Sequence, residues 1–500
     1  MRCLLLIIAA QLAVPLVYSQ PDYFATDLQY GNYPVGFKTI FTYDLSRHAV
    51  AEQNDNEKQG RFMQINIWYP AKKTNAVPLK FGKYIDLLPQ QSGKITRDVE
   101  TLAEKQFFNN TAELKGDTVL LRKHFNALAK SKTKAFSNAP VANGSFPLVM
   151  FSDYPNSQSI LCEYLASHGY IVVTAPVKGT YATAFEYSIG GIESGISDLQ
   201  FALSIVRKEF QVKQSFTVMG LGIGATVALG LQMRNPDVAG MISLEGGITT
   251  GFEFNLIRQS PYFNNERINK PMLVIHAPHP DVKPELTDAY KYTDRWLVNI
   301  PQSSEFYFLN YGIWESAMPG ILGKAPGDTK ASFEAAANYV LHFLSTIYKH
   351  ERFSPLTIDQ KIAITVYKES VPVPPDFHEL IALAERQGVA VIEKLYNERR
   401  EKDSEAIPFS SFYRVAEHFI VQKNFSIGAE WTALFAKAFP SSAVPWFMSG
   451  RCQLELNNKI AAKEFYEKAL ALLPGDVMLE EAEKNAYRPA IEKRIRELSS

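Results

Sequence analysis

The chain has 500 residues, enough for two or three domains, and its 46% hydrophobic and 21% charged content is ordinary for a globular protein. Its 52 Lys and Arg residues balance 52 Asp and Glu residues, so the formal net charge is zero. This balance excludes the basic excess with which proteins bind nucleic acid or an anionic membrane surface, and we expect neither as a partner.

The N-terminal segment has the form of a secretory signal peptide. An apolar run covers residues 4–17, and Val17 and Ser19 are small enough for the −3 and −1 positions of a cleavage site. Cys3 stands at the start of that run rather than after it, so it does not mark a lipid anchor. No later stretch reaches about 18 apolar residues. The sequence therefore predicts a signal peptide over residues 1–19, an exported protein, secreted or periplasmic, and no membrane span.

Alternating strands and helices follow. Phe37–Tyr43 and Arg61–Pro70 alternate in polarity as strands do. Residues 83–138 carry helical spacing and many charges, which predicts a helical insertion between strands. The continuous apolar run Phe146–Ser152 is typical of a central parallel strand, because both faces of such a strand are covered.

The pattern continues to about residue 350. Helices are predicted over Leu161–His168, Ile192–Phe210 and Ala331–Tyr348. Strands are predicted at positions 170–176, 214–220, 240–245, 271–277 and 305–310. This alternation predicts an α/β domain over residues 20–350, a mostly parallel sheet with helices on both faces.

The C-terminal part differs in composition. Residues 351–375 are rich in proline near their end and predict an extended linker, after which residues 376–500 show only helical patterns. The spacing over residues 446–474 matches a tetratricopeptide repeat, and Pro440 lies one 34-residue period before Pro474. A plain helical hairpin is the alternative. The matching residues are Trp446, Gly450, Ala462, Tyr466, Ala469 and Pro474.

The most informative motif is Met-Gly-Leu-Gly-Ile-Gly-Ala at residues 219–225. It lies between a predicted strand and a predicted helix, where a Gly-x-Ser-x-Gly turn would present a nucleophilic serine. Gly220 and Gly224 fit that frame, with Leu221 and Ile223 between them, but Gly222 stands in the place of the serine. A dinucleotide-binding loop is the weaker alternative, because it needs Gly-x-Gly-x-x-Gly early in a βαβ unit.

Three segments together resemble the platelet-activating-factor acetylhydrolase and dienelactone hydrolase branch of the α/β-hydrolases. They are Phe146–Ser152, the stretch Leu161–Val173 with its Leu-Ala-Ser-His-Gly-Tyr sequence, and the glycine turn. The resemblance covers roughly residues 35–348. It implies an eight-stranded α/β-hydrolase core and an ancestry in the hydrolysis of carboxylic esters.

The resemblance also places the catalytic positions, and most of them have changed. Gly222 has no side chain with which to attack an acyl carbon. Glu245 stands where the acetylhydrolases keep their acid, and Asp281 stands where the dienelactone hydrolases keep theirs. The histidine position corresponds to Ile313, and no histidine occurs between His279 and His342.

In the family, the turn after the strand that corresponds to Phe146–Ser152 carries a His-Gly pair and supplies an oxyanion-hole amide. This chain has Asp153 and Tyr154 instead, and a carboxylate would repel a developing oxyanion. The elbow, the base position and this turn all depart from what acyl transfer requires.

Other chemical groups give weaker signals. His276, His279 and Asp281 form a cluster near the expected carboxyl edge of the sheet, but three candidate ligands do not predict a metal site, and we expect neither a metal nor a cofactor. His168 lies in a turn where the resemblance implies a structural role. Ser194 lies between Glu193 and Gly195 without an elbow frame, so it is not expected to be a nucleophile.

The sequence therefore predicts an exported α/β-hydrolase-fold protein that binds a ligand or partner without turnover. A small acyl or ester-like molecule is expected in the core cleft, and a protein partner is expected on the helical tail. Two alternatives stay open: an ester hydrolase with an unorthodox nucleophile or base, and a scaffold in which only the tail binds.

Overall fold

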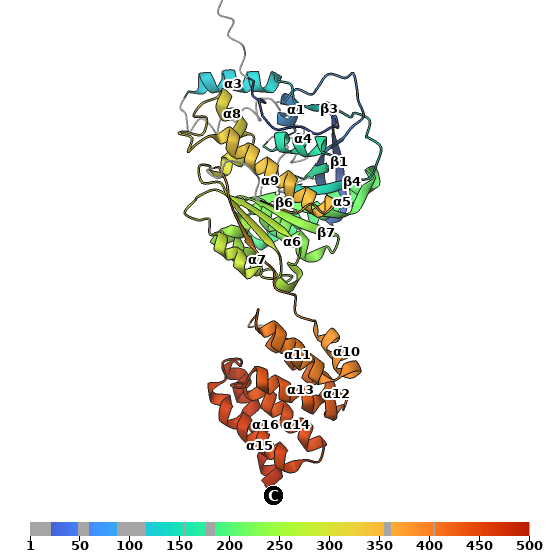
Figure 1. Ribbon diagram of the computed structural model, residues 1–500, viewed down its shortest axis with the longest axis vertical. Helices are drawn as coiled ribbons and strands as arrows, with labels where there is room; N and C mark the ends of the chain where they lie inside the picture. The colour runs from blue at the N-terminus through green and yellow to red at the C-terminus, as the bar shows by residue number, and fades with distance from the viewer. Residues whose placement is uncertain are drawn as a thin grey trace, which may run out of the picture. The chain divides into compact units, whose positions relative to one another are not determined.

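The computed structural model describes residues 22–48, 60–87, 117–153, 157–175, 186–354, 362–403 and 406–499. The predicted signal peptide lies outside these residues. The chain divides into two compact units, an α/β unit that ends at Ser370 and a helical unit that begins at Val371 (Figure 1). Among the described residues, no helix has the length and apolar character needed to cross a membrane.

One mixed sheet of ten strands forms the centre of the α/β unit. Six neighbouring strands from β9 to β5 are parallel, while β10 is antiparallel to β9 and β2 is antiparallel to both β5 and β1. In spatial order the strands are β10 (Ile364–Lys368), β9 (Arg295–Asn299), β8 (Met272–His276), β7 (Val238–Leu244), β6 (Val212–Leu221), β4 (Phe146–Ser152), β5 (Ile171–Thr174), β2 (Gly60–Pro70), β1 (Val35–His48) and β3 (Ala135–Ser137).

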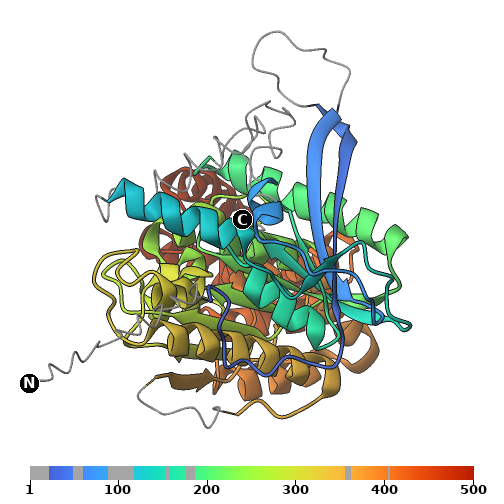
Figure 2. The same cartoon turned by 90° about the horizontal axis from the view of Figure 1, so that it is seen from above.

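Each face of the sheet packs against its own apolar core. In β4, Val149 and Phe151 join one core, while Leu148 and Met150 join the other. The first core is covered by α4 (Ser159–Ser167), α8 (Tyr311–Ala317) and α9 (Thr329–Lys349). The second is covered by α5 (Ile189–Glu209), α6 (Ile223–Arg234) and α7 (Gly251–Arg258), and Figure 2 shows gold α9 and green α5 on opposite sides of the sheet. This arrangement explains why the central strands are apolar along their whole length.

Strands β1 and β2 form a long hairpin whose outer part projects from the α/β unit (Figure 2). It is fastened to α5 by a buried ion pair in which Arg61 Nε and Nη2 each donate to Asp198 at 2.7 Å. Arg47 Nη2 also donates to Asp198, at 2.8 Å. Asp198 therefore joins the hairpin to the helix that covers one face of the sheet.

Two predictions at the end of the α/β unit were wrong. The segment 305–310 is not a strand, because Glu305–Phe308 forms a short 3₁₀ helix, η5, and the last parallel strand is β9. The expected linker 351–375 contains β10, which pairs with β9, and its residues Phe353 and Ala363 are buried in the core. Pro374 is buried too, and Arg399 Nη1 donates to the carbonyl of Val373 at 3.0 Å, which ties that stretch to the helical unit.

The predicted helical insertion 83–138 is also corrected in part. Helices α1 (Gly82–Ile85) and α3 (Thr118–Lys130) are present, but β3 at its end pairs with β1 as a strand. Residues 88–116 lie outside the described residues. With β3, β9 and β10, the sheet has ten strands where the resemblance implied eight.

The helical unit contains seven α-helices within its described residues. Gly388, at φ +85°, separates the first two of them. Gly450 allows α14 to approach α15 closely, since a Cβ there would lie 2.8 Å from the Tyr466 ring. The helices are α10 (Phe377–Gln387), α11 (Val389–Arg400), α12 (Phe409–Val421), α13 (Phe425–Ala438), α14 (Ala443–Glu455), α15 (Lys459–Leu472) and α16 (Glu481–Ser499).

Candidate functional site

The glycine turn between β6 and α6 has an unusual backbone conformation. Gly222 has φ +51° and ψ −127°, a region that residues with a side chain rarely adopt. A Cβ built on Gly222 meets no atom of the described residues within 4 Å, so among these residues nothing fills the space in front of the turn. The turn thus presents its central residue to that space, as a nucleophile elbow does, but without a reacting group.

The two outer glycines are required by close backbone packing. A Cβ on Gly220 would lie 2.1 Å from the backbone of Gly224, and one on Gly224 would lie 2.3 Å from the carbonyl oxygen of Ser152. Leu221 and Ile223 flank the central position, the one at the end of β6 and the other at the start of α6. The outer glycines, Gly220 and Gly224, are therefore needed for backbone packing, whereas the central residue, Gly222, is not confined by packing among the described residues.

A second tight turn, Glu245–Gly247, closes over the elbow. All three of its residues have positive φ, at +38°, +71° and +57°. The Gly222 amide donates to the carbonyls of Leu244, at 3.0 Å, and Glu245, at 2.7 Å. A Cβ on Gly247 would lie 2.2 Å from the Gly222 carbonyl oxygen, so the approach of the two turns needs glycine there.

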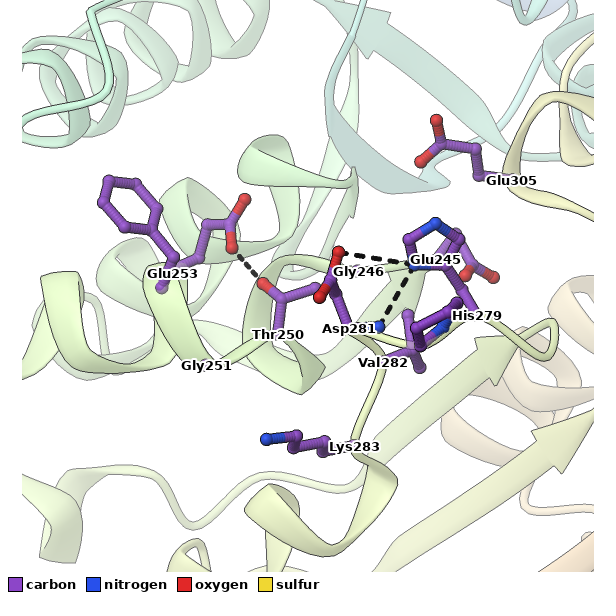
Figure 3. A pocket seen from close by; sticks show the side chains of 12 residues that line it. Glu245, Gly246, Thr250, Gly251, Glu253, His279, Asp281, Val282, Lys283 and Glu305 are labelled. Carbon is purple, nitrogen blue, oxygen red and sulfur yellow. Dashed lines mark hydrogen bonds and ion pairs between the residues drawn. The ribbon is translucent and has the colours of Figure 1, made fainter.

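A cavity of about 480 Å³ lies beside this turn, at the carboxyl ends of β7, β8 and β9 (Figure 3). Open α/β sheets bind their ligands at this edge. Four carboxylates line the cavity together with one histidine and one lysine. They are Glu245, Glu253, Asp281 and Glu305, with His279 and Lys283.

Glu245 directly follows β7 and is only 3% exposed. Its Oε2 accepts a hydrogen bond from the Ala277 amide at 2.6 Å. The pKa of this carboxyl is raised to about 8, chiefly by burial; the Ala277 bond lowers it and the nearby charge of Glu305 raises it, both by less than burial does. Glu245 is therefore largely protonated at neutral pH, unlike the ionised acid of a hydrolase triad.

Glu305 follows β9, the last parallel strand, and so occupies the region where the family keeps its histidine. Partial desolvation raises the pKa of its carboxyl, His279 lowers it and Glu253 raises it. Ile313, the residue predicted for the histidine position, lies in α8, fully buried in the core and outside the cavity lining. The sequence prediction had placed the last strand ten residues later than β9.

The loop after β8 brings His279 and Asp281 together at the cavity. His279 Nδ1 lies 3.8 Å from Asp281 Oδ2 and accepts from the Asp281 amide at 3.3 Å. Both side chains are largely exposed to solvent. His276 is buried at the end of β8, outside the cavity lining, and burial lowers its pKa. The three residues of the predicted cluster therefore do not all face one space.

The remaining candidates lie elsewhere. Asp153, buried at the end of β4, accepts from Ser157 Oγ at 3.3 Å, while Tyr154 lies outside the described residues. His168 Nε2 bonds to the carbonyl of Gln29 at 2.9 Å. Ser194 lies within α5.

Comparison of the sequence with known protein families and with curated proteins finds no match. Among solved structures, the chain is similar to a ferulic acid esterase from Streptomyces cinnamoneus, with a TM-score of 0.50 and 19% identity. The match covers 70% of this chain and 100% of that one. The α/β unit has the α/β-hydrolase fold. At this identity the likeness establishes the fold alone, so any activity must be argued from the cavity.

Proposed function

We propose that this protein is an exported α/β-hydrolase-fold protein that binds a small ligand in the cavity beside Gly222 without turning it over. The observation that carries the proposal is the conformation of Gly222. The elbow, which costs backbone strain in a hydrolase, is kept here while its nucleophile is replaced by hydrogen. Acyl transfer needs an attacking hydroxyl or thiol at this point.

No other group in the described cavity lining replaces the nucleophile. Its one hydroxyl belongs to Thr250, which is engaged with the carbonyl of Gly247 at 3.1 Å and with the Glu253 carboxylate. Asp153 after β4 also disfavours an oxyanion, because its carboxylate would repel the charge that develops in acyl transfer.

The helical unit supports a second part of the proposal, a protein partner. Its consecutive helices pack in pairs, and the close contact of Gly450 with Tyr466 supports tetratricopeptide-like packing of α14 on α15. Arrays of this kind use their surfaces to bind proteins. Pull-down with residues 371–500 and with the whole chain tests which unit carries the interaction.

The test of the non-catalytic proposal is an esterase assay of the mature chain. 4-Nitrophenyl acetate serves as the general substrate and methyl ferulate as the substrate suggested by the structural neighbour. We expect rates equal to those of heat-treated protein. Turnover that is lost in Glu305→Gln would overturn the proposal and would assign hydrolysis to the cavity carboxylates.

A further inference from the structure

The last helix of the chain, α16, is attached to the helical unit by a narrow stripe of side chains. Of its 19 residues, all of which the structure describes, only Ile491 is buried, and it joins a small core with Tyr466 of α15. Ile495 and Leu498 pack against the same core. Pro489 lies inside the helix, where it lacks the amide that other residues use for a main-chain hydrogen bond. We therefore expect α16 to be held less firmly than α14 and α15.

Tyr487 extends from α16 to two helices of the preceding pairs. Its ring centroid lies 5.3 Å from that of Phe447 in α14, with 82° between the ring planes. Its hydroxyl shares a hydrogen bond with the Tyr413 side chain in α12. Tyr413 and Phe447 are one 34-residue period apart, so they occupy equivalent positions in successive helix pairs and lie on one side of the unit. We refer to these two residues and the underlying Tyr466 as the aromatic face.

α16 covers the aromatic face without matching it well. The Tyr466 ring lies 5.8 Å from that of Phe447, and its hydroxyl is buried without a hydrogen-bond partner among the described residues. A buried hydroxyl in this state costs free energy. The carboxylates of Glu417 in α12 and Glu483 in α16 both act on the Tyr487 hydroxyl. Like charges therefore meet where α16 is seated.

The chain between α15 and α16 is fixed as far as Met478. Asp476 is buried, and its Oδ2 accepts from Ser442 Oγ at 2.8 Å and from the Ala443 amide at 2.7 Å. Its Oδ1 accepts from the Met478 amide at 2.8 Å. These bonds tie the end of α15 to the start of α14. Beyond them, α16 can separate as one piece while α15 keeps its place.

We propose that α16 is a detachable cover of the aromatic face, and that this face binds an amphipathic helix of a partner protein. In that helix an aromatic residue takes the place of Tyr487 and a basic residue takes the place of Glu483, where it would meet Glu417. α16 is the observed example of a helix seated there, which is why the proposed occupant is a helix. The inference rests on the second part of the proposed function, the protein partner, and names its chemical class.

Hydrogen–deuterium exchange of the mature chain, followed by mass spectrometry, measures the opening of α16. We expect its amides to be at least about tenfold less protected than those of α14 and α15. Tyr487→Ala should lower this protection further. Pro489→Ala should raise it at least about tenfold, because alanine restores a main-chain hydrogen bond inside the helix. Arg488→Ala is the matched control, since Arg488 is exposed between the two positions, and it should not change the protection.

A labelled peptide of residues 479–499 that carries Glu483→Lys is the probe for the partner site, read by fluorescence anisotropy. The mature chain with Tyr487→Ala, in which the cover is loosened, should bind it at least about tenfold more tightly than the parent chain. The chain with Pro489→Ala should bind it more weakly than the parent. The same peptide with Tyr487→Ala should not bind, and the peptide that keeps Glu483 should bind more weakly because Glu417 repels it.

Three results would overturn the inference: protection of α16 equal to that of α14 and α15, equal binding of the probe by the three chains, or binding of the peptide that lacks the tyrosine. Circular dichroism confirms that each variant is folded, and Pro489→Ala gives a test that does not depend on loosening the structure. A pull-down that captures no protein would instead overturn the partner in the proposed function, and the exchange measurement on α16 does not depend on that result.

Discussion

At the scale of single residues, Gly222 keeps the strained backbone conformation of a nucleophile elbow but lacks the side chain that a serine hydrolase places there. Its conformation is strained for any residue with a side chain, but a Cβ there would meet no atom of the described residues within 4 Å. Within the described part of the chain, a side chain at 222 is therefore opposed by backbone strain, while one at Gly224 would collide with Ser152. The cost of substitution should differ sharply between the two positions.

We expect Gly222→Ala to lower the free energy of unfolding by about 1–3 kcal/mol, the usual cost of a strained backbone conformation. Gly224→Ala should cost more, because its Cβ would lie 2.3 Å from a main-chain oxygen. Urea denaturation followed by tryptophan fluorescence measures both. Equal losses would show that the elbow is not held in this conformation.

Repair of the site tests where the base position lies. Gly222→Ser alone should give no esterase activity, since Glu305, after the last parallel strand, has a carboxyl group in place of the imidazole that would accept the hydroxyl proton. Adding Glu305→His should give weak but measurable hydrolysis of 4-nitrophenyl acetate, blocked by a serine-directed phosphonate. Adding Ile313→His instead should give none and should destabilise the fold, because Ile313 is fully buried in the core.

Glu245 should make stability depend on pH. Its pKa rises from 4.5 to about 8 on folding, so its protonated form is favoured in the native state. Its contribution is fully present below pH 4.5 and is lost as pH rises through about 8. Glu245→Gln should flatten the stability profile between pH 5 and 8 by an amount on the order of a few kcal/mol. Glu163, whose pKa is raised to about 7, is unchanged in this variant, so its contribution to the pH dependence of stability should remain.

The residues of the site were only partly predictable. Gly222, Glu245 and Asp281 each stand beside the end of a strand that the sequence marked clearly, and the structure places the last two in one cavity. Glu305 was missed because its local sequence, Glu-Phe-Tyr-Phe-Leu, resembles a strand. In the structure β9 is the last parallel strand, and this segment forms the 3₁₀ helix η5 instead.

At the scale of elements, the strongly apolar strands were predictable, and the short strands β9 and β10 at one end of the sheet were not. Central strands such as β4 are buried on both faces, and their composition shows it. β9 begins with a charged residue, Arg295, that is buried and donates to the carbonyl of Thr293 at 3.1 Å. β10 exposes Ile364, Val366 and Tyr367 and shows no periodic pattern. Pairing with β9, a tertiary contact, makes it a strand.

The attachment of the β1–β2 hairpin to α5 gives an element-scale prediction. Asp198→Ala should cost about 3–5 kcal/mol, because it removes the carboxylate that pairs with the buried guanidinium of Arg61. The exposed pair of Lys38 and Glu209 is the control, and Glu209→Ala should cost less than about 1 kcal/mol. Urea titrations of the two variants measure the difference. Similar losses would mean that the buried pair does not fasten the hairpin.

At the scale of the whole molecule, the boundary between the units lies after β10, about twenty residues beyond the predicted end of the α/β domain. A chain of residues 22–370 should unfold cooperatively. A chain of residues 22–354 should melt lower and aggregate, because it loses β10, uncovers Trp296 and leaves β9 as a bare edge. Differential scanning calorimetry and light scattering compare them, and identical melting would place the boundary before β10.

The join between β10 and the second unit has a mechanical consequence. Asp294 Oδ1 accepts from the Ser370 amide at 2.9 Å and from the Tyr367 hydroxyl at 3.1 Å, which clamps the chain where it leaves the sheet. Tension applied through the helical tail would load this clamp first and then the five-residue ladder of β10 on β9. We expect β10 to detach from β9 under force before the parallel strands that line the cavity are disturbed.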